Sequence, residues 1–180
     1  MKNKFYIIIF TLFFCSRIWA ETIFIEAKDI TLNKDQKITI FKNSVIVKTD
    51  TKEITSEFAE YNKSLGEVIL KNNIVATDNF NNTIKTNFAK YNNLQKAFET
   101  TGPTTLITSD NYSLEGSDIY FDNFNKIIKS SKNSILTDLS GNKIYLENFE
   151  YLANQNIFKS IGLVKIVDSL KNSYEFSQIY

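Results

Sequence analysis

Apolar residues recur at every second position along much of this chain. The segments Ile38-Thr39-Ile40 and Val45-Ile46-Val47 show this local period of two. Successive side chains of a strand point to opposite faces of a sheet, so a period of two gives one apolar face and one polar face. The pattern therefore predicts an all-β protein whose strands turn their apolar faces inward.

A larger unit of about thirty residues is superimposed on this alternation. Each copy has an apolar residue, a mostly small residue at the second position after it, an apolar residue at the fifth, and an aromatic residue or Leu at the seventh. The copies are Ile25-Ala27-Ile30-Leu32, Ile54-Ser56-Ala59-Tyr61, Ile84-Thr86-Ala89-Tyr91, Leu114-Gly116-Ile119-Phe121 and Ile144-Leu146-Phe149-Tyr151. Copies in phase indicate a repeat protein, in which a unit buries its apolar face only by stacking on its neighbours.

The second half of each unit repeats as well, in two more apolar columns separated by a polar segment. The columns are Val68, Phe98, Ile128, Phe158 and Ala76, Leu106, Leu136, Ile166. The polar segments are Lys42-Asn43-Ser44, Lys71-Asn72-Asn73, Thr101-Gly102-Pro103 and Ser131-Lys132-Asn133. Asn, Gly and Pro favour turns, so we predict two short strands and two turns in each unit, with no helix.

The spacing of three inside the repeat pattern breaks the alternation. A strand keeps both halves facing one way only through a bulge or bend at that point. We predict bulges or corners near Glu57-Phe58, Asn87-Phe88 and Ser117-Asp118. The expected architecture is an elongated stack of strands, either a β-solenoid or an open, twisted β-jelly roll, with a continuous apolar lining.

The first twenty residues differ from the rest. Lys2 and Lys4 precede an apolar run that ends at Cys15, and Ala20 stands before Glu21. This order is typical of a secretory signal peptide, and the run is shorter than the roughly 20 residues that span a bilayer. We expect a signal peptide over residues 1–20 and a repeat β domain over residues 21–180, with an uncleaved anchor as the alternative.

The two ends of the chain allow two further predictions, one on lipid attachment and one on the length of the protein. The only cysteine, Cys15, follows the bulky Phe14, which disfavours lipid attachment. Tyr174, Phe176 and Ile179 begin a sixth copy of the repeat, which is incomplete at residue 180. This favours the N-terminal part of a longer protein, with a free-standing protein as the alternative.

Charge and composition exclude several functions. The 21 basic and 20 acidic residues give a net charge of +1, which is no cationic surplus for a nucleic-acid surface. The chain has no His and its one Cys lies in the expected leader, so Ser-His-Asp catalysis and zinc sites built on Cys or His are excluded. We expect no enzyme, no metal and no cofactor.

Carboxylates remain as candidates for chemistry. Asp118 with Asp122, and Glu147 with Glu150, could serve glycoside hydrolysis as acid and nucleophile or base. The recurring residues Asp78, Asp138 and Asp168 could bind calcium. Solvated faces and polar turns explain both sets better, because they lie between the apolar columns and no Gly-rich metal loop accompanies them.

The apolar columns are the strongest indication of function. They mix large side chains with the small residues Ala59, Ala76 and Ala89. One interpretation is a dry packed core. The other is a groove that takes up acyl chains, whose burial contributes roughly 0.8 kcal/mol per CH₂.

At these positions the chain resembles the OstA-like lipopolysaccharide-transport family. The family includes periplasmic bridge proteins of the LptA type and the N-terminal domains of outer-membrane assembly proteins of the LptD type. The resemblance covers nearly all of residues 22–180 and rests on the phase of the repeat. It is carried by Ile25-Glu26-Ala27-Lys28-Asp29-Ile30-Thr31-Leu32 and by the turn copies Lys42-Asn43-Ser44-Val45, Lys71-Asn72-Asn73-Ile74 and Ser160-Ile161-Gly162-Leu163-Val164.

The resemblance implies a twisted β-jelly roll in the periplasm that shields the acyl chains of lipid A and passes lipopolysaccharide to the outer membrane. It implies related jelly-roll proteins as partners by edge-strand pairing, and an outer-membrane β-barrel component. The cysteines of LptD-type members are missing after the leader, so a disulfide-dependent assembly step is not expected. The alternatives are a β-solenoid scaffold or adhesin with a dry core, and a carbohydrate-active solenoid.

Carried over position by position, the lipid-binding lining would consist of Ile54, Ala59, Tyr61, Val68, Ala76, Ile84, Ala89, Tyr91, Phe98, Leu106, Leu114, Ile119, Phe121, Ile128, Leu136, Ile144, Phe149, Tyr151, Phe158 and Ile166.

Overall fold

The computed structural model describes residues 23–33 and 37–180, which form sixteen β-strands. The expected signal peptide and Cys15 lie outside the described residues. Within the described part, no helix is long and apolar enough to cross a membrane. The all-β fold class predicted from the alternation is confirmed.

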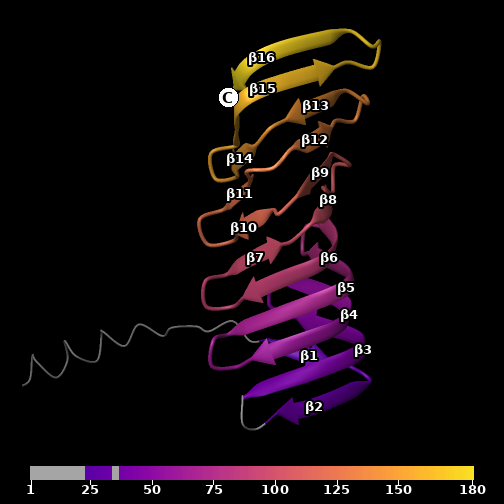
Figure 1. The fold of residues 1–180 in the computed structure, drawn as a ribbon, viewed down its shortest axis with the longest axis vertical. Coiled ribbons are helices and arrows are strands. Elements are labelled where there is room, and N and C mark those ends of the chain that lie inside the picture. The colour runs from indigo at the N-terminus through magenta and orange to yellow at the C-terminus, as the bar shows by residue number, and fades with distance from the viewer. Residues whose placement is uncertain (1–22, 34–36) are drawn as a thin grey trace, which may run out of the picture.

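The strands pair antiparallel throughout and stack along one axis (Figure 1). The first eight are β1 (Phe24–Glu26), β2 (Asp29–Asn33), β3 (Ile38–Lys48), β4 (Lys52–Asn62), β5 (Glu67–Asp78), β6 (Thr83–Asn92), β7 (Ala97–Thr100) and β8 (Pro103–Ile107). The last eight are β9 (Ser113–Ser117), β10 (Tyr120–Asp122), β11 (Ile127–Ser130), β12 (Ser134–Thr137), β13 (Lys143–Leu146), β14 (Phe149–Leu152), β15 (Ile157–Val167) and β16 (Ser173–Ile179).

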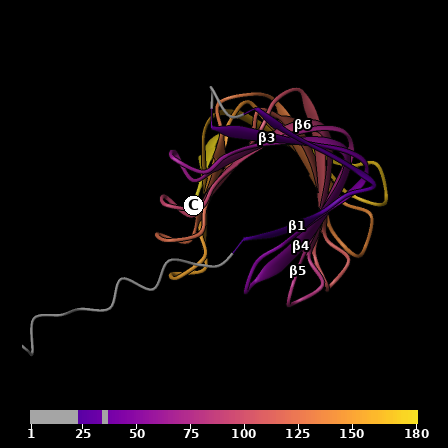
Figure 2. The ribbon, with the colours of Figure 1, turned by 90° about the horizontal axis from the view of Figure 1, so that it is seen from below.

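The sheet divides into two arms in the middle of the molecule. The second half of β6 pairs with β7 and its first half pairs with β8. From there β7, β10, β11 and β14 form a first arm, and β8, β9, β12 and β13 form a second arm. Strand β15 joins both arms again, because it pairs with β14 and with β13. Seen along the stack, the strands curve into an incomplete ring (Figure 2).

The bend between the two arms lies where the repeat predicted it. The register shifts between Thr55 and Phe58 on β4. Opposite Phe88, it shifts between Lys71 and Ile74 on β5. Farther along the stack the bend becomes a break, and Asp118 sits between β9 and β10 with a φ of 52°. The predicted bulges and corners are therefore confirmed.

The polar segments of the repeat do not reverse the chain, contrary to the prediction of two short strands joined by turns. Strand β3 runs through Asn43-Ser44 and β5 runs through Asn72-Asn73 without interruption. All four residues have positive φ, between 50° and 66°. Asn tolerates the left-handed region, and this tolerance serves a bulge as well as a turn. These segments are the corners of the jelly roll.

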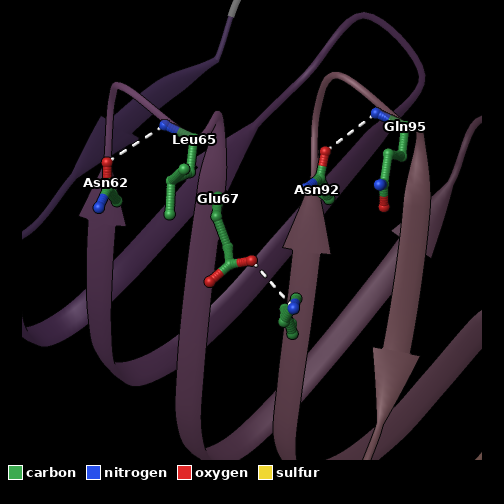
Figure 3. A network of polar contacts seen from close by, with 6 residues as sticks. Asn62, Leu65, Glu67, Asn92 and Gln95 are labelled. Atoms are coloured by element: carbon green, nitrogen blue, oxygen red, sulfur yellow. Dashed lines mark hydrogen bonds and ion pairs between the residues drawn. The ribbon is translucent and has the colours of Figure 1, made fainter.

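The reversing turns form two columns at the outer ends of the arms (Figure 1). The first turn column comprises residues 62–66, 92–96, 122–126 and 152–156, and the second comprises residues 49–52, 78–82, 108–112, 138–142 and 168–172. Figure 3 shows two successive turns of the first column, in which the side-chain oxygens of Asn62 and Asn92 accept hydrogen bonds from the backbone N–H groups of Leu65 and Gln95. Between them, Glu67 forms an ion pair of 3.0 Å with the Nζ of Lys90.

Buried hydroxyl groups satisfy the backbone where the chain bends. Thr100, Ser130 and Ser160 recur at thirty-residue spacing and are at most 6% exposed. Thr100 Oγ1 accepts a hydrogen bond of 3.0 Å from the backbone N–H of Ile119. Ser130 and Ser160 each donate to a backbone carbonyl, at 2.7 and 2.6 Å. A bend disrupts the ladder of a sheet, so these hydroxyls replace hydrogen bonds that the strands do not make there.

Candidate functional site

A groove of about 770 Å³ lies between the two arms. Its first wall carries Phe98, Phe121, Ile128, Phe149, Tyr151 and Phe158, and its second wall carries Ala76, Ile84, Leu106, Leu114 and Leu136. All of these residues were predicted from the inward columns of the repeat. The groove is left open because the inward-facing side chains of the two arms do not reach one another across it.

The aromatic side chains of the first wall pack against one another along the stack. The rings of Phe98 and Phe121 meet edge to face, with centroids 5.9 Å apart. The rings of Phe149 and Phe158 are stacked with centroids 5.8 Å apart. Contacts of this kind add about 0.5–1.5 kcal/mol beyond the area that they bury. The first wall is therefore a continuous apolar surface that keeps its shape beside an open space.

The remaining predicted residues lie outside the groove. Ile54, Ala59, Val68, Ala89, Tyr91 and Ile119 are at most 1% exposed and belong to the packed core. Tyr61, Ile144 and Ile166 are half-buried and pack against that core. The structure thus divides the inward set into a packed section and a groove section. The role of either set in lipid binding stays a prediction.

The rim of the groove comes from the turn columns, which the repeat did not assign to the lining. Phe80 and Tyr112 of the second turn column line the groove and are 76% and 41% exposed. Asp122 and Lys126 of the first turn column line it from the other side. The sequence singled out Asp78 and Asp122 only as candidates for chemistry, and it did not indicate Phe80, Tyr112 or Lys126. The site has apolar walls and a polar, mixed-charge rim.

One rim carboxylate is held in its charged form by its own turn. Hydrogen bonds from the backbone N–H and side-chain amide of Asn125, with a further bond from the N–H of Phe124, hold the pKa of Asp122 below its usual range. Lys129 adds a smaller effect in the same direction. Asp122 is therefore charged at neutral pH and marks the rim as the water-facing part of the groove.

The carboxylate pairs considered for glycoside chemistry have structural partners. Asp118 and Glu147 are exposed and accept hydrogen bonds from backbone N–H groups at 2.8 and 3.2 Å. Glu150 forms an ion pair of 3.8 Å with a lysine on the neighbouring strand. Of the four, Asp122 alone lines the groove, where it closes its turn. This placement gives no support to the carbohydrate-active alternative.

The recurring aspartates also act within their turns. The side chains of Asp78, Asp138 and Asp168 each accept a hydrogen bond of 2.8–2.9 Å from the backbone N–H of the fourth residue after them. This confirms the interpretation of these residues as turn polarity. Across residues 23–33 and 37–180, no group of three His, Cys, Asp or Glu side chains could hold a metal ion.

No family model matches the chain, and no curated protein matches it. Among solved structures, the chain is similar to LptH from Pseudomonas aeruginosa, described as the LptA-homologous periplasmic component of the conserved lipopolysaccharide transport device. The TM-score is 0.54 at 16% sequence identity, over 60% of this chain and 80% of LptH. Identity at this level establishes the fold alone. The chain has the β-jelly-roll fold of an LptA-like protein.

Proposed function

We propose that this protein carries lipopolysaccharide through the periplasm and shields the acyl chains of lipid A in the groove between its two arms. The observation that carries the proposal is a continuous apolar groove, open to solvent, on a fold similar to that of LptH. A groove lined by Phe121, Leu114 and Leu136 attracts hydrocarbon without any charged site. Each buried methylene contributes roughly 0.8 kcal/mol.

The distribution of polar groups fits an amphiphile. Apolar side chains line the walls, whereas Asp78, Asp122 and Lys126 lie at the rim. Acyl chains would lie along the walls and the hydrated headgroup would remain at the rim, because desolvating charged groups is costly. The chain would carry its cargo passively.

The two ends of the stack support partners that pair edge to edge. Strands β1 and β2 form one end and β16 forms the other, and among residues 23–33 and 37–180 each has a paired neighbour on one side only. Ile30 and Leu32 on β2, and Tyr174 and Phe176 on β16, are between 46% and 59% exposed. Unpaired strand edges with exposed apolar side chains are templates for another strand. Related jelly-roll proteins, and a component of the outer membrane, are the proposed partners.

Adjacent residues on opposite faces of β12 provide a direct test. Leu136 lines the groove, whereas its neighbour Ile135 points to the other face of the sheet. Leu136→Lys places an ammonium group among the acyl chains and should weaken lipopolysaccharide binding by the purified chain more than tenfold. Ile135→Lys adds the same charge outside the groove and should leave binding unchanged.

The outcomes separate the proposed function from the scaffold alternative. Binding by the wild type that is lost only in Leu136→Lys supports transport through the groove. Equal binding by both variants, or no binding by the wild type, contradicts the proposal and favours a scaffold with a dry core. Circular dichroism of each variant checks that the sheet is intact.

A further inference from the structure

At one end of the groove, a contact joins the two arms. Lys52 lies in the part of β4 that continues the second arm, and Tyr91 lies in the part of β6 that continues the first arm. The Nζ of Lys52 is 5.6 Å from the centroid of the Tyr91 ring. Lys52 lines the groove, and Tyr91 is 1% exposed. The pair therefore spans the interior from one arm to the other.

The interior behind this contact is buried. Val47, Ile54, Ala59 and Val68, which lie on the N-terminal side of Tyr91 in the stack, have 0% exposure. The groove begins next to this contact, with Ala76 of β5 on the second wall and Phe98 of β7 on the first wall. Close-packed interiors hold few voids larger than a water molecule, so no hydrocarbon chain can pass beyond the contact without moving side chains.

We propose that Tyr91, held by Lys52, is the end wall of the groove and limits the length of the acyl chain that it accepts. The inference rests on the proposed function, since it concerns the same groove. From Phe98 on β7 to Phe158 on β15, the first wall crosses five successive strands. At a strand spacing of about 4.8 Å, this wall is about 19 Å long. A chain lying along it meets Tyr91 at the N-terminal end.

Two substitutions should move the wall in opposite directions. Tyr91→Ala removes the ring and extends the groove toward Val68. Ala76→Leu adds side-chain volume at the start of the groove, where Ala76 is 5% exposed, and shortens it. Tyr112→Ala is the matched control, because Tyr112 lines the mouth of the groove, at the rim, and not its end.

The experiment measures how tightly the full chain binds saturated fatty acids from octanoate to stearate, by displacement of a fluorescent fatty acid. For the wild type, affinity should rise about fourfold per added methylene, which corresponds to 0.8 kcal/mol, and then level off where the chain reaches the wall. Affinity should level off at a longer chain for Tyr91→Ala and at a shorter chain for Ala76→Leu. Tyr112→Ala should weaken binding at every chain length without changing the length at which affinity levels off.

The outcomes distinguish a failure of the proposed function from a failure of the end wall alone. If the wild type binds no fatty acid, the groove does not hold acyl chains and the proposed function fails together with the wall. If the wild type binds and levels off, but at the same length in Tyr91→Ala and Ala76→Leu, the groove is a lipid site and the end wall is refuted. If Tyr91→Ala does not fold, Ala76→Leu alone decides, since a wall at Tyr91 requires it to shorten the accepted chain.

Discussion

The hydroxyl of Thr100 provides the sharpest test of how the two arms are joined. It accepts the backbone N–H of Ile119 at 3.0 Å, and both residues are at most 4% exposed. Thr100→Val keeps the shape of the side chain and removes this acceptor. A buried N–H without a partner costs about 1–3 kcal/mol. The Thr104 hydroxyl also loses its hydrogen bond of 2.8 Å to Thr100 Oγ1, but it still has the carbonyl of Gly102 as an acceptor at 3.1 Å. The expected loss in the free energy of unfolding is therefore about 2 kcal/mol.

Urea denaturation followed by circular dichroism measures this loss. Thr105→Val is the matched control, because Thr105 is half-exposed in the middle of β8 and its substitution should change stability by less than about 0.5 kcal/mol. Thr100→Ser keeps the hydroxyl and should lose about 1 kcal/mol, through the missing methyl group. If Thr100→Val and Thr105→Val have the same stability, the hydroxyl does not hold the bend and the reasoning fails.

Two further predictions concern a corner and a turn. Gly162 has a φ of 111°, and a Cβ added there would meet the carboxylate of Glu147, whereas Gly102 has a φ of 79° and open space around it. In thermal unfolding, Gly162→Ala should lower the free energy of unfolding by about 1–3 kcal/mol and Gly102→Ala should lower it by less. Equal losses in the two variants would contradict the contact with Glu147. Hydrogen bonds from the Asn142 side chain lower the pKa of Asp138, so the stability that this carboxylate contributes is present above the unfolded pKa of about 3.9 and is lost as the pH falls through the folded pKa. Asp138→Asn should therefore weaken the drop in urea midpoint below about pH 4, and an unchanged drop would refute that role.

The inward side chains were predictable from the sequence because the local period of two and the thirty-residue repeat select the same positions. A local period of two selects one face of each strand, and the thirty-residue repeat aligns equivalent positions in successive strands. Phe121 and Phe149 were assigned to the interior in this way, and both are at most 6% exposed. The corners followed from the same pattern, since a spacing of three cannot be continued without a bulge.

The difference between bulge and turn was not predictable at Asn72-Asn73. Asn adopts positive φ in either structure, and the choice depends on how β5 pairs with its flanking strands β4 and β6. Nor could the repeat distinguish Tyr91 from Phe98, which are direct partners across β6 and β7. Tyr91 lies in the packed section, whereas Phe98 lines the groove.

A photo-crosslinker placed at Phe121 tests the central claim most directly. Phe121 lines the groove, and the preceding residue, Tyr120, points to the outer face of the same strand. In cells that make lipopolysaccharide, the proposed function predicts a lipopolysaccharide adduct with the probe at position 121 and none with the probe at position 120. Equal adducts at both positions, or none at position 121, would contradict the claim that acyl chains travel in this groove.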